Sequence, residues 1–149
     1  FDELFKERIT YLINTAQAND KIKHNNIHFM TNKEAEMVKM FKNCYLAAKV
    51  SFCNEMYQFC NTKHVNYENV RKVACSDSRI GHSHSYVPGP DGKTGFSGTC
   101  FPKDTSSLQY EMEQTGMETF VLKSVIERNN KVDRKEQDWN DNKGRAVVN

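Results

Sequence analysis

The feature that most constrains the fold is a stretch of 30 residues, 31–60, that contains neither glycine nor proline. It opens with Thr31-Asn-Lys-Glu34, the pattern of a capping box, in which the two outer side chains bond to free N–H groups at a helix start. No residue in the stretch is a strong helix terminator before Cys60. The sequence therefore predicts one long helix over residues 31–60.

The apolar residues of this helix fall on two opposite sides, since successive side chains are rotated by about 100°. One stripe holds Met37, Phe41, Cys44, Ala48, Phe52 and Phe59, and the other holds Leu46, Val50, Cys53, Tyr57 and Cys60. A helix that is apolar on two sides packs between neighbours. We therefore expect residues 31–60 to form the centre of the domain.

Amphipathic spacing predicts three further helices, over residues 2–18, over residues 67–75 and from residue 106 onward. Together they predict an all-α fold, a small disulfide-stabilised bundle of about four helices around the long helix. A chain of 149 residues is long enough for one core. We predict a single helical domain over 1–128, with a loop insertion at 76–104. The stretch 129–149 is charged and weakly periodic, which predicts a polar C-terminal tail that is frayed or disordered.

The five cysteines include no Cys-x-x-Cys pair, which argues against a zinc ribbon or a thioredoxin-type site. One interpretation is five reduced thiols in a core, and the favoured interpretation is disulfides formed in an oxidising compartment. If the chain turns near His64, Cys53 and Cys75 are each 11 residues from the turn and lie level. Cys60 lies on the same face of the long helix as Cys53 and can form a disulfide with Cys100. The expected pairs are Cys53–Cys75 and Cys60–Cys100, with Cys44 as a free thiol.

The loop at 76–104 contains the segment GHSHSYVPGPDGKTGFSGTC, residues 81–100, with five of the seven glycines and two of the three prolines. Pro90-Asp-Gly92 has the chemistry of a turn, so residues 83–87 and 94–101 can pair as a small β-hairpin. Loops of more than about 12–15 residues in compact domains are usually functional or disordered. We expect Tyr86 and Phe96 to be exposed anchors for a protein partner, with Lys93 beside them.

His82 and His84 point the same way in an extended segment, so the two imidazoles form a candidate pair of ligands for Zn²⁺ or Cu²⁺. A closed metal site needs a third or fourth ligand, and a solvated polar loop is the favoured interpretation. Gly92-Lys-Thr94 resembles part of a phosphate-binding loop, but Val87 stands where that pattern requires glycine. We therefore expect no cofactor, with zinc or copper as the alternative.

The net charge of +2 and the scattered basic residues argue against a nucleic-acid partner, and no apolar run is long enough to insert into a membrane. The favoured hypothesis is a secreted, extracellular or periplasmic, non-enzymatic helical effector that binds an unidentified protein through the 77–104 loop. One alternative is a carrier of a small apolar ligand between helices, lined by aromatic residues and methionines. Another is a small secreted hydrolase or metal-binding protein that uses His82 and His84.

Overall fold

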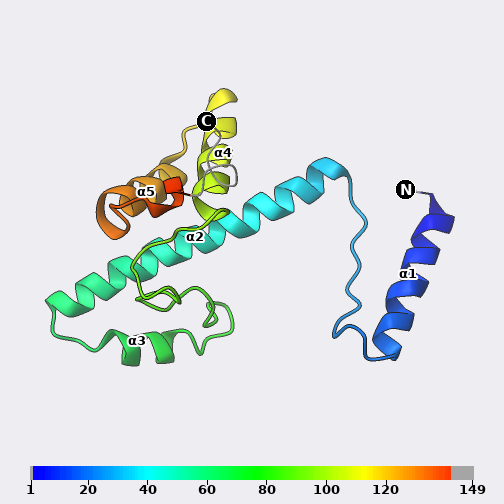
Figure 1. Ribbon diagram of the computed structural model, residues 1–149, viewed down its shortest axis with the longest axis horizontal. Coiled ribbons are helices and arrows are strands. Elements are labelled where there is room, and N and C mark those ends of the chain that lie inside the picture. The colour runs from blue at the N-terminus through cyan, green and yellow to red at the C-terminus, as the bar shows by residue number, and fades with distance from the viewer. Residues whose placement is uncertain (1, 142–149) are drawn as a thin grey trace. The chain divides into compact units, whose positions relative to one another are not determined.

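The computed structural model describes residues 2–141, and every regular element in that range is helical (Figure 1). The α-helices are α1 (Glu3–Ala18), α2 (Asn32–Thr62), α3 (Tyr67–Ala74), α4 (Phe101–Gln114) and α5 (Phe120–Arg128). A π-helical turn η1 (Asn129–Asp133) and a 3₁₀ turn η2 (Asp138–Asp141) follow. The predicted all-α class is confirmed for this part of the chain. The predicted β-hairpin does not form, because residues 83–87 and 94–101 contain no strand.

The chain divides into two compact units, residues 1–37 and 38–149, which we describe separately. In the first unit, Asp2 caps α1 by accepting a hydrogen bond from the backbone N–H of Leu4 at 3.2 Å. The predicted capping box is confirmed at the start of α2. Glu34 Oε2 accepts from the backbone N–H of Thr31 at 2.7 Å, and Thr31 Oγ1 accepts from the N–H of Glu34 at 3.3 Å.

In the second unit, α2 contributes to three buried apolar clusters along its length. Cys44 packs with Leu108 of α4 and Leu122 of α5, whereas Cys53 and Cys60 pack with Tyr67 of α3. Between them, α2 packs against the loop that precedes α4 and against α5, in a cluster formed by Ala47, Phe96 and Val125. Figure 1 shows α4 and α5 along one stretch of α2 and α3 beside its C-terminal part. The apolar residues Phe41, Phe52 and Phe59 of the first predicted stripe are exposed in this chain.

The last part of the second unit differs from the sequence-based expectation of one continuous helix from residue 106. The structure has two helices there, because Gly116 adopts φ = +80° after α4 and ends it. The loop is also shorter than predicted. Helix α4 begins at Phe101, with Pro102 in its first turn, where a missing N–H costs nothing.

Residues 129–141 belong to the predicted polar tail, and in the structure they form η1 and η2, with Trp139 buried. The remainder of that predicted tail, 142–149, lies outside the described residues. The single domain over 1–128 stays a prediction. Within residues 2–141, no helix combines the length and the apolar character needed to span a membrane.

The predicted disulfides are wrong: all five cysteines are free thiols. Cys75 is close enough to Cys53 for its charge to help raise the pKa of Cys53, but the two are not bonded. Cys60 is buried against Tyr67, whereas Cys100 is exposed at the start of α4, so this pair is not formed either. Cys44 is free, as are the other four cysteines. Helix spacing brings Cys53 and Cys75 level with each other but does not determine whether their thiols are oxidised.

Candidate functional site

The loop that precedes α4 brings one cysteine to the protein surface. Cys100 is the residue immediately before α4 and is exposed, whereas the other four cysteines are buried. The N-terminus of a helix carries a partial positive charge, which favours negative charge on a group bound at this place. The ammonium group of Lys103 is also close. Its hydrogen bond to Asp104 raises the pKa of Lys103, and the charge of Cys100 adds to that effect.

The buried thiols are poor nucleophiles by comparison. Burial, followed by the nearby charge of Asp104, raises the pKa of Cys44 to about 11. Burial likewise raises the pKa of Cys53, only partly offset by a hydrogen bond with Tyr67. The thiolate is the reactive form of cysteine. Cys100 is therefore the cysteine best placed for chemistry with a ligand in solution.

A polar cluster lies one helical turn beyond Cys100, where α4 packs against α2. The Asp104 carboxylate is only 1% exposed. Its Oδ2 accepts a hydrogen bond from Asn43 Nδ2 at 2.6 Å and lies 3.6 Å from Lys39 Nζ, and its Oδ1 accepts from Lys103 Nζ. Burial acts to raise the pKa of Asp104, but these hydrogen bonds and the two lysine charges outweigh it and hold the pKa below its usual value. Asp104 is thus an ionised carboxylate that orders two ammonium groups and an amide.

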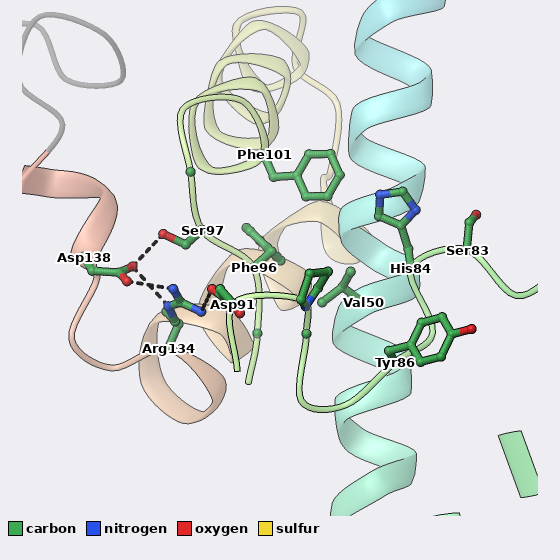
Figure 2. Close-up of a pocket in the computed structure, with 14 residues that line it drawn as sticks. Val50, Ser83, His84, Tyr86, Asp91, Phe96, Ser97, Phe101, Arg134 and Asp138 are labelled. Atoms are coloured by element: carbon green, nitrogen blue, oxygen red, sulfur yellow. Dashed lines mark hydrogen bonds and ion pairs between the residues drawn. The ribbon is translucent and has the colours of Figure 1, made fainter. Parts of the chain in front are cut away.

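The loop before α4 also lines a pocket of about 660 Å³ (Figure 2). Its lining residues include Gly98 and Phe101, which stand on either side of Cys100 in the sequence, but not Cys100 itself. Phe96, Phe101 and Val50 give it an apolar wall. His84 packs on Phe101, with ring centroids 5.6 Å apart, and Tyr86 also lines the pocket. Pockets that combine aromatic walls with a few polar groups are typical sites for small ligands.

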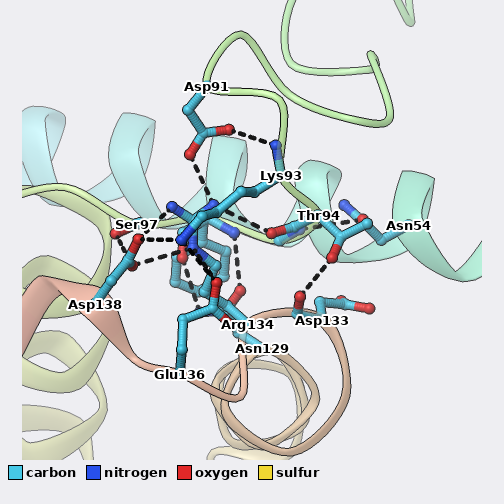
Figure 3. Close-up of polar contacts among 12 residues, drawn as sticks. Asn54, Asp91, Lys93, Thr94, Ser97, Asn129, Asp133, Arg134, Glu136 and Asp138 are labelled. Atoms are coloured by element: carbon cyan, nitrogen blue, oxygen red, sulfur yellow. Dashed lines mark hydrogen bonds and ion pairs between the residues drawn. The ribbon is translucent and has the colours of Figure 1, made fainter.

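The polar side of the pocket is built around one buried arginine, Arg134 (Figure 3). Its Nε and Nη2 atoms donate to the two carboxylate oxygens of Asp138 at 3.0 and 2.7 Å, and Nη1 lies 2.7 Å from Asp91 Oδ2. Ser97 donates to Asp138 Oδ1 at 2.5 Å, so the network also holds the loop before Cys100. Hydrogen bonds from Arg134 and Ser97 keep the pKa of Asp138 far below its usual value.

The three residues predicted to bind a protein partner occupy different environments. Tyr86 is 54% exposed, with the Arg71 guanidinium 3.9 Å from its ring centroid. Phe96 is buried at 5% exposure, so it is not the exposed anchor that the loop composition suggested. Lys93 is engaged in ion pairs with Glu136 at 3.0 Å and Asp138 at 3.2 Å. The structure brings Tyr86 and Phe96 together as parts of the pocket wall, and their partner role stays a prediction.

The two histidines of the predicted metal pair lie in the same loop but in different settings. His84 lines the pocket, and the backbone C=O of His82 accepts a hydrogen bond from Ser85 at 2.7 Å. Across residues 2–141, no three or more His, Cys, Asp or Glu side chains are grouped as a metal site would require. His82 and His84 therefore have no third ligand within that range.

Sequence reasoning missed Lys39, Asn43, Asp104 and Arg134 as site residues. A signal existed for three of them. Lys39 and Asn43 are four residues apart on one face of the predicted helix, and Asp104 follows Cys100 by four residues in a segment that starts with proline at position 102. Arg134 had no such signal, because the segment after residue 128 is polar and weakly periodic.

The geometry can be compared with known proteins. The sequence model described as "UDP-glucose/GDP-mannose dehydrogenase family, central domain" matches residues 33–131. The chain belongs to the UDP-glucose/GDP-mannose dehydrogenase family. The matched range contains α2 apart from its first residue, α3 to α5, Cys100, the polar cluster of Asp104 and most of the pocket, whereas α1 lies before it.

Several family members resemble the chain closely. It is 40% identical to the UDP-glucose 6-dehydrogenase of Pseudomonas aeruginosa over 106 residues, which are 71% of this chain and 22% of that protein. It is 34% identical to the UDP-glucose 6-dehydrogenase of Campylobacter jejuni over 107 residues, 72% of this chain and 25% of that protein. The enzyme of Rickettsia felis with the same name is 37% identical over 95 residues, 64% of this chain and 20% of that protein. The chain thus spans about a fifth to a quarter of the length of these curated relatives.

Membership in this family corrects the function predicted from the sequence. A family of dehydrogenases contradicts a secreted, non-enzymatic effector, and it equally contradicts the carrier and the hydrolase or metal-binding alternatives. The expectation of no cofactor is also wrong, because a dehydrogenase needs an acceptor for the hydride that it removes. The extracellular or periplasmic location depended on disulfides that are not formed, and the family match overturns it. The amino-acid composition is compatible with both a secreted binding protein and an enzyme. The expectation of disulfides favoured the first, and it was wrong.

Proposed function

We propose that this chain is the thiol-bearing central part of an enzyme that oxidises UDP-glucose at carbon 6. The observation that carries the proposal is the position of Cys100, an exposed thiol at the N-terminus of α4. It stands next to Phe101, which lines the 660 Å³ pocket, and four residues before Asp104 in the sequence. The family match and the relatives named UDP-glucose 6-dehydrogenase support this substrate. A sugar nucleotide has both rings and charged groups, which suits a pocket with aromatic and charged walls.

The proposed role of Cys100 follows from the chemistry of carbon 6. That carbon bears a primary hydroxyl group, and loss of a hydride and a proton turns it into an aldehyde. The hydride would be taken up by NAD⁺, the proposed cofactor, held outside the described residues of this chain. The Cys100 thiolate then adds to the aldehyde carbon, so that a C–S bond forms and the carbonyl electron pair moves to oxygen, which takes up a proton. The covalent adduct keeps the reactive aldehyde in the pocket.

The Asp104 cluster supports this addition through charge. Negative charge develops on the carbonyl oxygen as the thiolate attacks, and fixed cationic donors lower the energy of such a transition state. Lys39 and Lys103 supply two ammonium groups that the Asp104 carboxylate holds, and Lys103 interacts with the charge of Cys100. Asn43 fixes that carboxylate from the α2 side through its 2.6 Å hydrogen bond.

The described residues do not fit a dinucleotide site. Such sites normally use a strand, a glycine-rich turn and a helix whose N-terminus faces the pyrophosphate. Residues 2–141 contain no strand, and the glycine-rich loop at 81–100 leads from one helix to the next. The NAD⁺ site is therefore not built from the described part of this chain.

The test is an oxidation assay on the protein that carries this chain, with NAD⁺ and either UDP-glucose or GDP-mannose. We expect reduction of NAD⁺ with UDP-glucose and a sugar nucleotide product oxidised at carbon 6, identified by mass spectrometry. Little or no reduction is expected with GDP-mannose. Activity with GDP-mannose alone, or with neither sugar nucleotide, would contradict the proposal.

A further inference from the structure

The side chain of Asn129 binds the backbone of the loop that leads to Cys100 (Figure 3). Asn129 is the first residue of η1 and is fully buried, at 0% exposure. Its Oδ1 accepts a hydrogen bond from the backbone N–H of Phe96 at 2.8 Å, and its Nδ2 donates to the C=O of the same residue at 2.9 Å. The amide thus pairs with Phe96 as a neighbouring peptide group does in an antiparallel sheet.

The residue before Phe96 makes this close pairing possible. Gly95 has φ = +71°, and a Cβ atom there would lie 2.6 Å from Asn129 Oδ1 and 3.0 Å from Asp133 Cβ. The position therefore requires glycine for both its conformation and its space. From the opposite side, the Gly95 N–H donates to Asn54 Oδ1 of α2 at 3.1 Å. The loop is held between α2 and η1 at this point.

These contacts fix the chain on one side of Cys100, and α4 fixes it on the other. The ring of Phe101 packs on that of Phe96, with centroids 6.1 Å apart, so the two sides are joined by an apolar contact. Further along α4, Asp104 bonds to Asn43 of α2. The Sγ atom of Cys100 itself lies 3.8 Å from Thr99 Oγ1, a neighbour that moves with the same loop.

We propose that Asn129 is a positioning residue for the reactive thiol: it fixes the backbone of Phe96 and thereby sets the position of Cys100. Without the two hydrogen bonds, the buried N–H and C=O groups of Phe96 lose their partners, and the loop moves to satisfy them elsewhere. Cys100 then leaves its position at the helix start. The catalytic consequence of this inference rests on the proposed function, whereas the structural part does not.

A spin label on Cys100 measures the structural part directly. Because Cys100 is the exposed cysteine, a nitroxide methanethiosulfonate reacts there while the buried thiols are protected. We expect a single slow component in the EPR spectrum of the labelled parent protein and an added fast component in Asn129→Ala. The matched control is Leu122→Ala, which removes buried apolar contacts in the cluster of Cys44 and Leu108 without touching the loop. A fast component in both variants, or in neither, would overturn the inference.

A second variant approaches the same contact from the opposite side if Asn129→Ala does not fold. Gly95→Ala places a methyl group against Asn129 Oδ1 and should displace the amide. We expect the same fast component. A Gly95→Ala spectrum identical to that of the parent protein would overturn the inference.

Steady-state kinetics of the unlabelled variants separate this inference from the proposed function. Per titrated Cys100 thiol, Asn129→Ala should lose kcat on the order of 10²-fold, because small displacements of a reacting group cost about that much. KM for UDP-glucose should change less than about threefold, since the interaction acts on the reacting step. Unchanged kcat in an active enzyme would overturn the inference and leave the proposed function standing. A parent protein that does not oxidise UDP-glucose, with the expected EPR spectra, would overturn the proposed function and support the positioning role.

Discussion

Replacing Cys100 with alanine should abolish steady-state turnover of UDP-glucose, with a fall in kcat on the order of 10⁴-fold or more, because the aldehyde is no longer captured by a covalent nucleophile. The Cys100 thiol is exposed and stands at the N-terminus of α4. The ammonium group of Lys103, three residues further along the chain, is held by Asp104. The amines of Lys39 and Lys103 are held in ion pairs by Asp104, which leaves the thiol as the proposed nucleophile. The measurement is kcat with NAD⁺ and UDP-glucose for the parent and the variant.

Two further variants make the result interpretable. Cys100→Ser keeps the shape of the side chain but supplies a much weaker nucleophile at neutral pH, so it should be nearly as inactive. Cys60→Ala removes a buried thiol that packs with Cys53 and Tyr67, and none of these three residues lines the pocket. This variant should keep kcat while lowering thermal stability. If Cys100→Ala keeps a tenth or more of the parent kcat (about 1.4 kcal/mol in barrier height), Cys100 is not the reacting group.

Replacing Arg134 with methionine should destabilise the protein by about 3 kcal/mol, near the lower end for breaking a buried ion pair. The guanidinium is buried and has Asp138, Asp91 and the backbone C=O of Thr94 as partners. The loss is at the lower end because Asp91 and Asp138 keep contact with water. The measurement is the free energy of unfolding in urea at neutral pH. Because Arg134 and Asp138 line the pocket, KM for UDP-glucose should also rise.

The matched control for this substitution is Arg79→Met. Arg79 makes a similar forked contact with Asp77, but its side chain is 88% exposed, so its loss should cost less than about 1 kcal/mol. Equal destabilisation by the two variants would show that burial of Arg134 does not matter.

The effect of Arg134→Met should also depend on pH in a defined direction. Hydrogen bonds from Arg134 and Ser97 lower the pKa of Asp138, so its stabilising contribution is present above the unfolded pKa and is lost as the pH falls through the folded one. The difference between parent and variant should therefore be full at neutral pH and shrink below about pH 4. A difference that stays constant into strong acid would contradict this account.

The sequence was most informative where local signals and packing agree. Thr31 and Glu34 predicted the start of α2, and the absence of glycine and proline through residue 60 predicted its length; the structure gives α2 as Asn32–Thr62. The helix predicted at 67–75 from its apolar spacing is α3, Tyr67–Ala74, and in the structure Asn66 caps it. The break between α4 and α5 was missed because the apolar periodicity of 117–125 outweighed the single residue Gly116, whose positive φ ends α4.

The site was harder to predict because its parts meet only after folding. Lys39 and Asn43 share a face of α2, but their partner Asp104 is more than sixty residues away in sequence. Cys100 was interpreted as a structural anchor, because spacing alone does not distinguish a disulfide from a reactive thiol. Asn129 and Arg134 lie in a polar segment without periodicity, and their burial comes from hydrogen bonds to the loop. Such polar burial leaves no apolar pattern in the sequence.

The most direct test of the central claim is the rate of Cys100 alkylation by iodoacetamide in the native protein, followed by peptide mass spectrometry, with and without UDP-glucose. We expect Cys100 to be the cysteine that reacts first, because the other four are buried. Saturating UDP-glucose should slow its alkylation by about tenfold or more, since a sugar bound with its carbon 6 against Cys100 excludes the reagent. GDP-mannose at the same concentration should protect far less. Equal alkylation rates with and without UDP-glucose would contradict the placement of its carbon 6 next to Cys100.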